Sequence, residues 1–126
     1  MILQRTIQSE VSTVGVGLHT GEKVKITLCP APEGHGVVFQ RDDITGQPKI
    51  TVNPQVVTET KLCSTLGTKD FSIATVEHLM SALSATGVDN ILVKLDGSEI
   101  PIMDGSAISF IHLINIINNV FMKSQL

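Results

Sequence analysis

A glutamate and a histidine stand side by side in the segment TVEH (75–78), and together they could carry out metal-dependent hydrolysis. A neutral imidazole can bind zinc, while a nearby carboxylate can take a proton from the attacking water. Adjacent helical residues point about 100° apart, so His78 can bind an ion while Glu77 reaches a water from the side. Taken alone, such a pair is far more often a solvated surface feature than a metal site.

A complete zinc site cannot be assembled from this sequence. Such a site normally takes three protein ligands plus water, and the chain contains no HExxH motif. None of its four histidines is followed by an aspartate in the spacing HxxxD, which would place two ligands on one helix face. The residues by themselves leave zinc binding open.

Two further segments carry polar side chains beside glycine. GVGLHTG (15–21) reads as a tight β connection with an exposed imidazole at His19, and it lacks the lysine and spacing of a phosphate-binding loop. PIMDGS (101–106) reads as a turn in which Asp104 or Ser106 caps a following helix. Both segments have ordinary structural explanations.

The two cysteines, Cys29 and Cys63, stand far apart without a CxxC motif. In a cytosolic chain this pattern is typical of two reduced, partly buried thiols. Cys63 lies in an expected strand shortly before the helix that carries His78, where it reads as a small core residue.

The elements that must position these residues form an α+β domain, one sheet covered on one face by two helices. Short β-branched runs separated by glycine and proline predict strands at 14–16, 24–28, 37–40 and 50–52. In the second half, apolar periodicity predicts helices over 73–86 and 106–119, a strand over 91–95, and a short return over 99–102.

The first helix is expected to turn His78 away from the sheet. Five apolar residues fall on one stripe that should face the core, namely Ile73, Val76, Leu79, Met80 and Leu83. Small residues surround His78 on the helix surface: Ala74, Ser81, Ala82 and Ala85. If Ser72 or Thr75 caps the helix, the exposed backbone amides of its first turn add positive potential near Glu77. Because the second helix is apolar most of the way round, we expect a further protein layer against both helices.

Composition argues against nucleic acid as a partner. The 126 residues carry a net charge of -3, with 9 Lys and Arg, 3% aromatics, and neither Trp nor Tyr. Phosphate binding and base stacking both lack their usual residues. The N-terminus has no signal-peptide pattern and no apolar run reaches about 18 residues, so we expect a cytoplasmic protein without a transmembrane segment.

Five motifs in order resemble the UDP-3-O-acyl-N-acetylglucosamine deacetylase family, which is zinc-dependent and acts in lipid A biosynthesis. They are GVGLHTG (15–21), KLCSTL (61–66), TVEHLMSAL (75–83), GVDNI (87–91) and EIPIMDGSA (99–107). The resemblance extends from the first residues to about Asn119. It implies a ribosomal-protein-S5-like domain, one of two similar α+β domains whose helical layers face each other around the metal.

By this resemblance His78 is a zinc ligand and Glu77 is the general base. His19, Leu62 and Cys63 would line the active-site side of the domain near the substrate. The implied reaction removes acetate from the N-acetyl group of a UDP-linked, 3-O-acylated glucosamine. The family's other ligands, a histidine and an aspartate spaced as HxxxD, and a further catalytic histidine lie in its second domain and have no counterpart here.

We therefore expect a deacetylase domain over residues 1–119, a divergent tail over 120–126, and no second catalytic domain, so that the chain would be inactive alone. An alternative is a non-catalytic domain that self-associates through the alanine-lined helical face. Nucleic-acid binding through a ribosomal-protein-like fold is a third hypothesis, which the charge balance disfavours.

Overall fold

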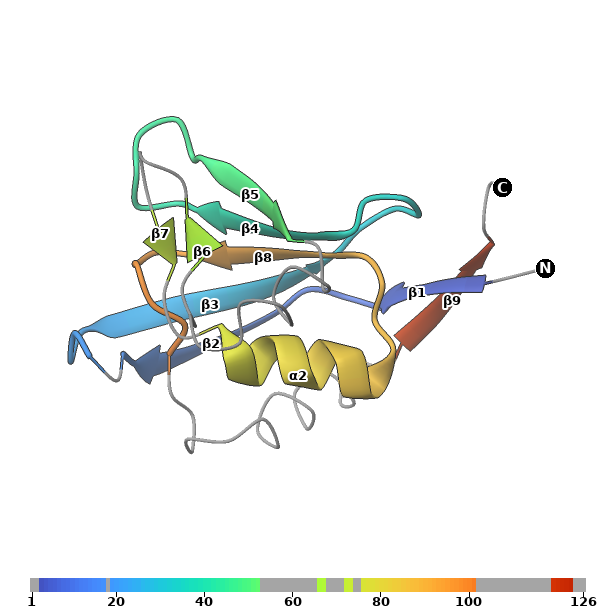
Figure 1. Ribbon diagram of the computed structural model, residues 1–126, viewed down its shortest axis with the longest axis horizontal. Helices are drawn as coiled ribbons and strands as arrows, with labels where there is room; N and C mark the ends of the chain where they lie inside the picture. Colours follow the sequence, from blue (N-terminus) through green and yellow to red (C-terminus); the bar gives the residue numbers. More distant parts are fainter. Residues whose placement is uncertain are drawn as a thin grey trace.

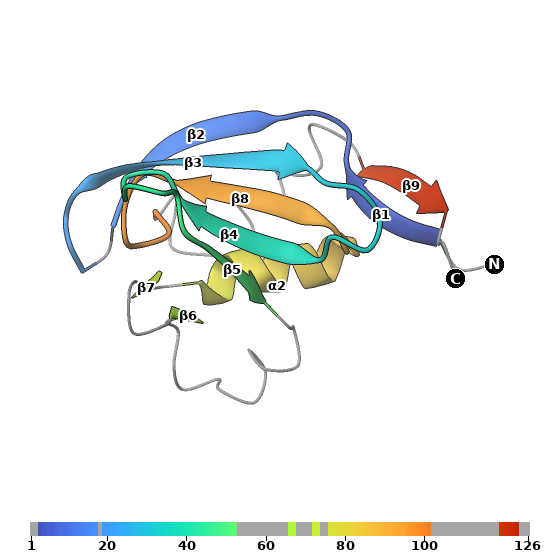
Figure 2. The same ribbon diagram turned by 90° about the horizontal axis from the view of Figure 1, so that it is seen from above.

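The apolar runs of the sequence form one mixed sheet of five strands, seen from two sides in Figures 1 and 2. The computed structural model describes residues 3–17, 19–52, 66–67, 72–73, 76–101 and 119–123. In spatial order the strands are β2 (Val11–Val16), β3 (Lys23–Pro30), β8 (Ile91–Leu95), β4 (Val37–Arg41) and β5 (Lys49–Val52). The strands predicted at 14–16, 24–28, 37–40, 50–52 and 91–95 are therefore confirmed. The strand expected to carry Cys63 lies outside the described residues.

The central strand β8 joins the two halves of the sheet. It pairs antiparallel with β3 and parallel with β4, while the outer pairs β2–β3 and β4–β5 are antiparallel. Alternate residues of β8 are buried, and every residue of β4 is buried. The central strands β8 and β4 therefore form part of the hydrophobic core.

One described helix, α2 (Glu77–Thr86), covers one face of this sheet (Figures 1 and 2). The predicted core stripe is confirmed, since each of its members is at most 8% exposed: Ile73, Val76, Leu79, Met80 and Leu83. The helix ends at Gly87, whose φ of 74° lies in the left-handed region that favours glycine. A mixed sheet with a helix packed on it is an α+β arrangement.

The start of α2 differs from the expectation. Ser72 and Ile73 form strand β7 (Ser72–Ile73), which pairs with β6 (Leu66–Gly67), and the helix begins only at Glu77. Val76 occupies the N-cap position, where its side chain offers no acceptor, so neither Ser72 nor Thr75 is the N-cap residue. Ile73, which periodicity alone assigned to the helix, thus belongs to a strand.

A separate two-stranded sheet lies near the two chain ends. It consists of β1 (Leu3–Ile7) and β9 (Asn119–Lys123), which pair antiparallel near both chain ends (Figure 1). The expected second helix, 106–119, lies outside the described residues except for Asn119, which begins β9. Two-helix cover, the S5-like detail and a boundary at residue 119 remain predictions.

The short return expected over 99–102 is not a strand in its described part. Glu99 is an isolated bridge residue, and Ile100 and Pro101 belong to no element. The Glu99 side chain contacts the turn that carries His19 and Thr20. In the part of the chain that the structure describes, no helix is long and apolar enough to cross a membrane.

Candidate active site at one end of the sheet

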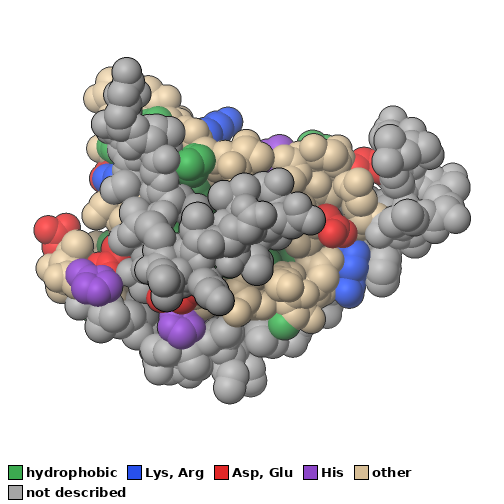
Figure 3. Space-filling model, in the orientation of Figure 1, with side chains coloured by type: hydrophobic (Ala, Val, Ile, Leu, Met, Phe, Trp, Pro, Cys, Tyr) green, Lys and Arg blue, Asp and Glu red, His purple; other side chains and the backbone are tan. Residues whose placement is uncertain are grey.

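Three segments far apart in the sequence meet at one end of the molecule. The turn between β2 and β3, the start of α2 and the chain leaving β8 lie at this end in both views (Figures 1 and 2). They carry His19, the pair Glu77 and His78, and Glu99. The space-filling view shows histidine and acidic side chains on this part of the surface (Figure 3).

The pair Glu77 and His78 opens the first turn of α2. Glu77 is exposed and His78 is half-buried, and neither side chain has a hydrogen bond or ion pair with another described residue. The free backbone N–H groups of the first turn give a positive potential that favours a carboxylate there. Both side chains are therefore available to a ligand or to another protein layer.

The helix surface around His78 is only partly open. Ser81 and Ala85 are exposed, as expected, but Ala82 is 0% exposed and belongs to the core cluster. The assignment of Ala82 to an open face was therefore wrong. The core reaches further round the helix than the five-residue stripe, which narrows the small-residue face beside His78.

His19 sits on a tight turn between β2 and β3. The turn is closed by two backbone hydrogen bonds of 2.9 Å, from Gly17 N to Glu22 O and from Gly21 N to Gly17 O. A third bond of 3.2 Å runs from Glu22 N to the hydroxyl of Thr20. The His19 side chain is 70% exposed, so the expected tight connection with an exposed imidazole is confirmed.

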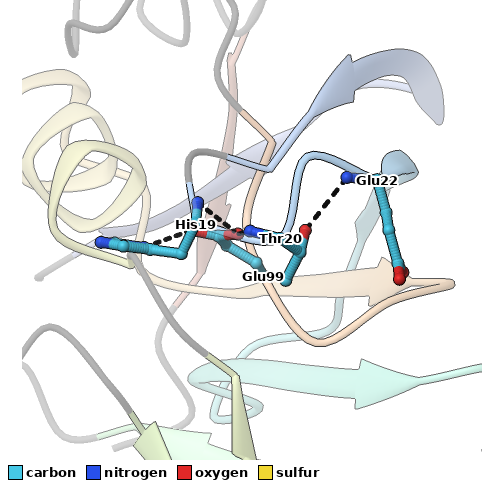
Figure 4. Close-up of polar contacts among 4 residues, drawn as sticks. All are labelled: His19, Thr20, Glu22 and Glu99. Atoms are coloured by element: carbon cyan, nitrogen blue, oxygen red, sulfur yellow. Dashed lines mark hydrogen bonds and ion pairs between the residues drawn. The ribbon is translucent and has the colours of Figure 1, made fainter.

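The carboxylate of Glu99 contacts the backbone of this turn (Figure 4). The Glu99 side chain is buried, with 1% of its surface exposed. The backbone N–H of His19 lies 3.1 Å from each carboxylate oxygen, and the N–H of Thr20 donates to Oε1 at 3.2 Å. Nδ1 of the His19 ring lies 2.7 Å from Oε2. The buried charge is thus met by hydrogen bonds from the loop, as a buried carboxylate requires.

Gly17 makes room for that carboxylate. A Cβ at this buried position would collide with Oε1 of Glu99 and would lie 2.5 Å from the Thr20 hydroxyl. Only a residue without a side chain lets Glu99 reach the N–H groups of the turn. This glycine therefore belongs to the construction of the site.

The sequence-based interpretation missed the role of Glu99. It interpreted PIMDGS (101–106) as a turn and helix cap and EIPIMDGSA (99–107) as a family motif, and it assigned Glu99 no function. The available signal was a single acidic residue after the turn that ends β8, followed by Ile100 and Pro101, which are buried. Its partner could not be found from sequence, because His19 stands 80 positions away.

Leu62 and Cys63 lie outside the described residues. Within the described ranges, no group of three or more His, Cys, Asp or Glu side chains is placed to hold a metal ion. The described residues thus offer His78 as one candidate ligand and do not complete a metal centre by themselves.

Taken together, these features define an α+β domain with a carboxylate–histidine pair at a helix start and a second histidine held by a buried carboxylate. The family model described as UDP-3-O-acyl N-acetylglycosamine deacetylase (LpxC) matches residues 4–125. The chain belongs to this family.

Relatives of the same name are similar over nearly the whole chain. The UDP-3-O-acyl-N-acetylglucosamine deacetylase of Colwellia psychrerythraea is 51% identical over 90% of this chain and 38% of its own length. That of Neisseria gonorrhoeae is 47% identical over 98% of this chain and 41% of its length. That of Stenotrophomonas maltophilia is 51% identical over 90% of this chain and 38% of its own length. The chain spans about two fifths of the length of the curated relatives that it matches.

Proposed function

We propose that this chain forms one side of the active site of a zinc-dependent deacetylase that acts on UDP-3-O-acyl-N-acetylglucosamine in lipid A biosynthesis. The observation that carries the proposal is the pair Glu77 and His78, unpartnered among the described residues, at the start of α2 in a chain of this family. Family membership favours this hydrolase over a non-catalytic, self-associating domain.

His78 would contribute one zinc ligand. Its half-buried ring has no hydrogen-bond partner among the described residues, which leaves a ring nitrogen free for coordination. The remaining ligands would come from outside the described residues, by the family resemblance from a second domain. Bound zinc would polarise the carbonyl of the scissile amide.

Glu77 would act as the general base. Its exposed carboxylate stands next to His78 in the positive potential of the helix start, where it can accept a proton from the attacking water. It could then deliver that proton to the leaving amine, so that the products are acetate and a free amino group. His19, Leu62 and Cys63 would line the substrate side.

The UDP-linked acylated amino sugar would bind between this domain and the layer that brings the other ligands. That layer would pack against α2 beside the exposed Ser81 and Ala85. A cytoplasmic location fits a nucleotide-linked substrate. Activity is expected to require further ligands, because the one candidate ligand among the described residues does not make a zinc site.

The test combines this chain with the remaining part of a family enzyme, for example that of the N. gonorrhoeae relative, fused or added in trans. Zinc retained after dialysis should rise towards equimolar only when both parts are present. His78→Ala should abolish this gain, whereas His35→Ala, on a loop before β4, should not.

Glu77→Gln should retain zinc and lower the deacetylation rate about 10²- to 10⁴-fold, the usual contribution of a general base. The matched control is Ser81→Ala, an exposed change one turn further along α2. Zinc retention by the His78→Ala variant, or full activity of Glu77→Gln, would refute the assigned roles.

A further inference from the structure

We propose that Glu99 is a positioning residue that fixes the His19 imidazole with its proton on Nδ1 and so presents Nε2 as a hydrogen-bond acceptor. The acceptor would bind an O–H or N–H group of the substrate sugar, and this second half rests on the proposed function. The first half is a property of the chain alone.

The direction of the ring hydrogen bond follows from the other contacts of Glu99. Both carboxylate oxygens already accept from backbone N–H groups: Oε1 from His19 and Thr20, Oε2 from His19. N–H donors on both oxygens stabilise the ionised carboxylate, which has only acceptor sites. The ring nitrogen 2.7 Å from Oε2 must therefore carry a hydrogen, which places the proton of the neutral ring on Nδ1.

The consequence appears at the opposite ring nitrogen. With the proton on Nδ1, Nε2 of a neutral imidazole carries a lone pair, and the His19 side chain is 70% exposed. Figure 4 shows the ring extending away from Glu99, with its second nitrogen at the free end. This end of the molecule also carries the start of α2 (Figures 1 and 2).

Holding the turn does not by itself require a charge at position 99. The two backbone N–H groups need only one good acceptor oxygen, which the side-chain carbonyl of glutamine would supply in the same shape. Its NH2 group, however, would face Nδ1 of His19 and could only donate. Glu99→Gln should therefore keep the turn and move the ring proton to Nε2.

The experiment records the ¹⁵N resonances of the histidine rings in the full 126-residue chain at a pH where the rings are neutral. His19→Gln identifies the His19 signals. His35 is an internal reference, because its Nδ1 lies 2.9 Å from the Gly36 carbonyl, which can only accept. Both rings should show the proton on Nδ1 in the wild type.

In Glu99→Gln the His19 signals should change to the Nε2-protonated form while those of His35 stay. The tautomer ratio should shift at least about tenfold, since hydrogen bonds to charged groups contribute more than neutral ones. Backbone ¹H–¹⁵N spectra of Thr20 and Glu22 report whether the turn persists. A wild-type His19 ring protonated on Nε2, or an unchanged tautomer in a folded Glu99→Gln, overturns the proposal.

A second measurement tests the substrate-facing half in the reconstituted enzyme. Glu99→Gln should raise KM at least about tenfold with a smaller change in kcat, because an acceptor for a bound group has become a donor. A shifted tautomer with unchanged kinetics would limit Glu99 to shaping the ring and refute the substrate contact. An inactive wild type would instead count against the proposed function, leaving the tautomer result standing.

Discussion

Oε2 of Glu99 lies 2.7 Å from Nδ1 of His19, although 80 positions separate the two residues in the chain. The contact links the turn between β2 and β3 to the segment that follows β8. β3 and β8 are direct antiparallel neighbours with Ile26 opposite Leu95, so the start of β3 and the end of β8 lie at the same end of the sheet. The pairing of β3 with β8 thus places the buried carboxylate of Glu99 next to the exposed imidazole of His19.

Gly17→Ala should destabilise the fold by about 1–3 kcal/mol, because the added Cβ collides with the buried Glu99 carboxylate and the Thr20 hydroxyl. Urea unfolding followed by circular dichroism measures the loss. Gly34→Ala is the matched control: its φ is +81° but open space surrounds it, so it should cost about 1 kcal/mol of backbone strain and less than Gly17→Ala. Equal losses in the two variants would contradict the steric role of Gly17.

Asn90→Ala should lower the free energy of unfolding by about 1–3 kcal/mol, because it leaves a backbone N–H without its partner. Asn90 is 2% exposed, its Oδ1 accepts from Gly36 N at 2.8 Å, and its Nδ2 donates to Gln4 Oε1 at 2.8 Å. Denaturant titration measures the change. Ser84→Ala, exposed on α2, should stay within about 0.5 kcal/mol of wild type, and a similar value for Asn90→Ala would show that its hydrogen bonds contribute nothing.

Cys29 should be alkylated more slowly in the folded protein than in urea at pH 8. Burial raises the pKa of its thiol, and Glu10, whose Oε1 accepts from Sγ at 3.5 Å, raises that pKa further. Because the thiolate is the reactive form, Glu10→Gln should lower the pKa and accelerate alkylation, while burial keeps the rate below that in urea. In a Cys63→Ser background, iodoacetamide labelling by mass spectrometry reports this single site.

The control for that experiment is Glu22→Gln, an exposed carboxylate on the turn between β2 and β3. It should leave the alkylation rate of Cys29 unchanged. If both glutamine variants react at the wild-type rate, the hydrogen bond from the thiol to Glu10 has no effect on its pKa.

Asp43→Asn should reduce stability by at most about 1 kcal/mol at neutral pH, since Asp43 is partly exposed and solvent weakens such pairs. Hydrogen bonding from Arg41, whose Nε donates to Oδ1 at 2.8 Å, holds the pKa of the Asp43 carboxyl below its usual range. A lowered folded-state pKa stabilises the fold above the unfolded value of about 3.9 and loses this contribution as pH falls through the folded value.

The stability difference between wild type and Asp43→Asn should therefore be constant from pH 7 to about pH 5 and shrink below about pH 4. Thermal unfolding across this pH range tests the sign. A difference that grows on acidification would mean that the pKa of Asp43 is raised in the folded state.

Much of the architecture is determined by the sequence itself, through local periodicity. Alternating and β-branched runs predicted the strands of the sheet, and the 3.6-residue stripe ending at Leu83 predicted which side of α2 is buried. These patterns are local because each residue's orientation depends on its own turn or strand. The motif order, including the pair Glu77 and His78, indicated the family that the comparison then identified.

Only the tertiary structure decided where α2 begins, that Ala82 is buried, and that Glu99 reaches the His19 turn. The burial of Ala82 and the position of Glu99 depend on partners distant in the chain, through the depth of the core and the β3–β8 register. The start of α2 follows a short-range pairing between β6 and β7, which the periodicity of the helix did not reveal. Periodicity predicts the direction in which a side chain leaves its own helix or strand. The position of a buried carboxylate depends instead on the N–H groups that donate hydrogen bonds to it. Those donors are selected by strand pairing across the sheet, which no local pattern encodes.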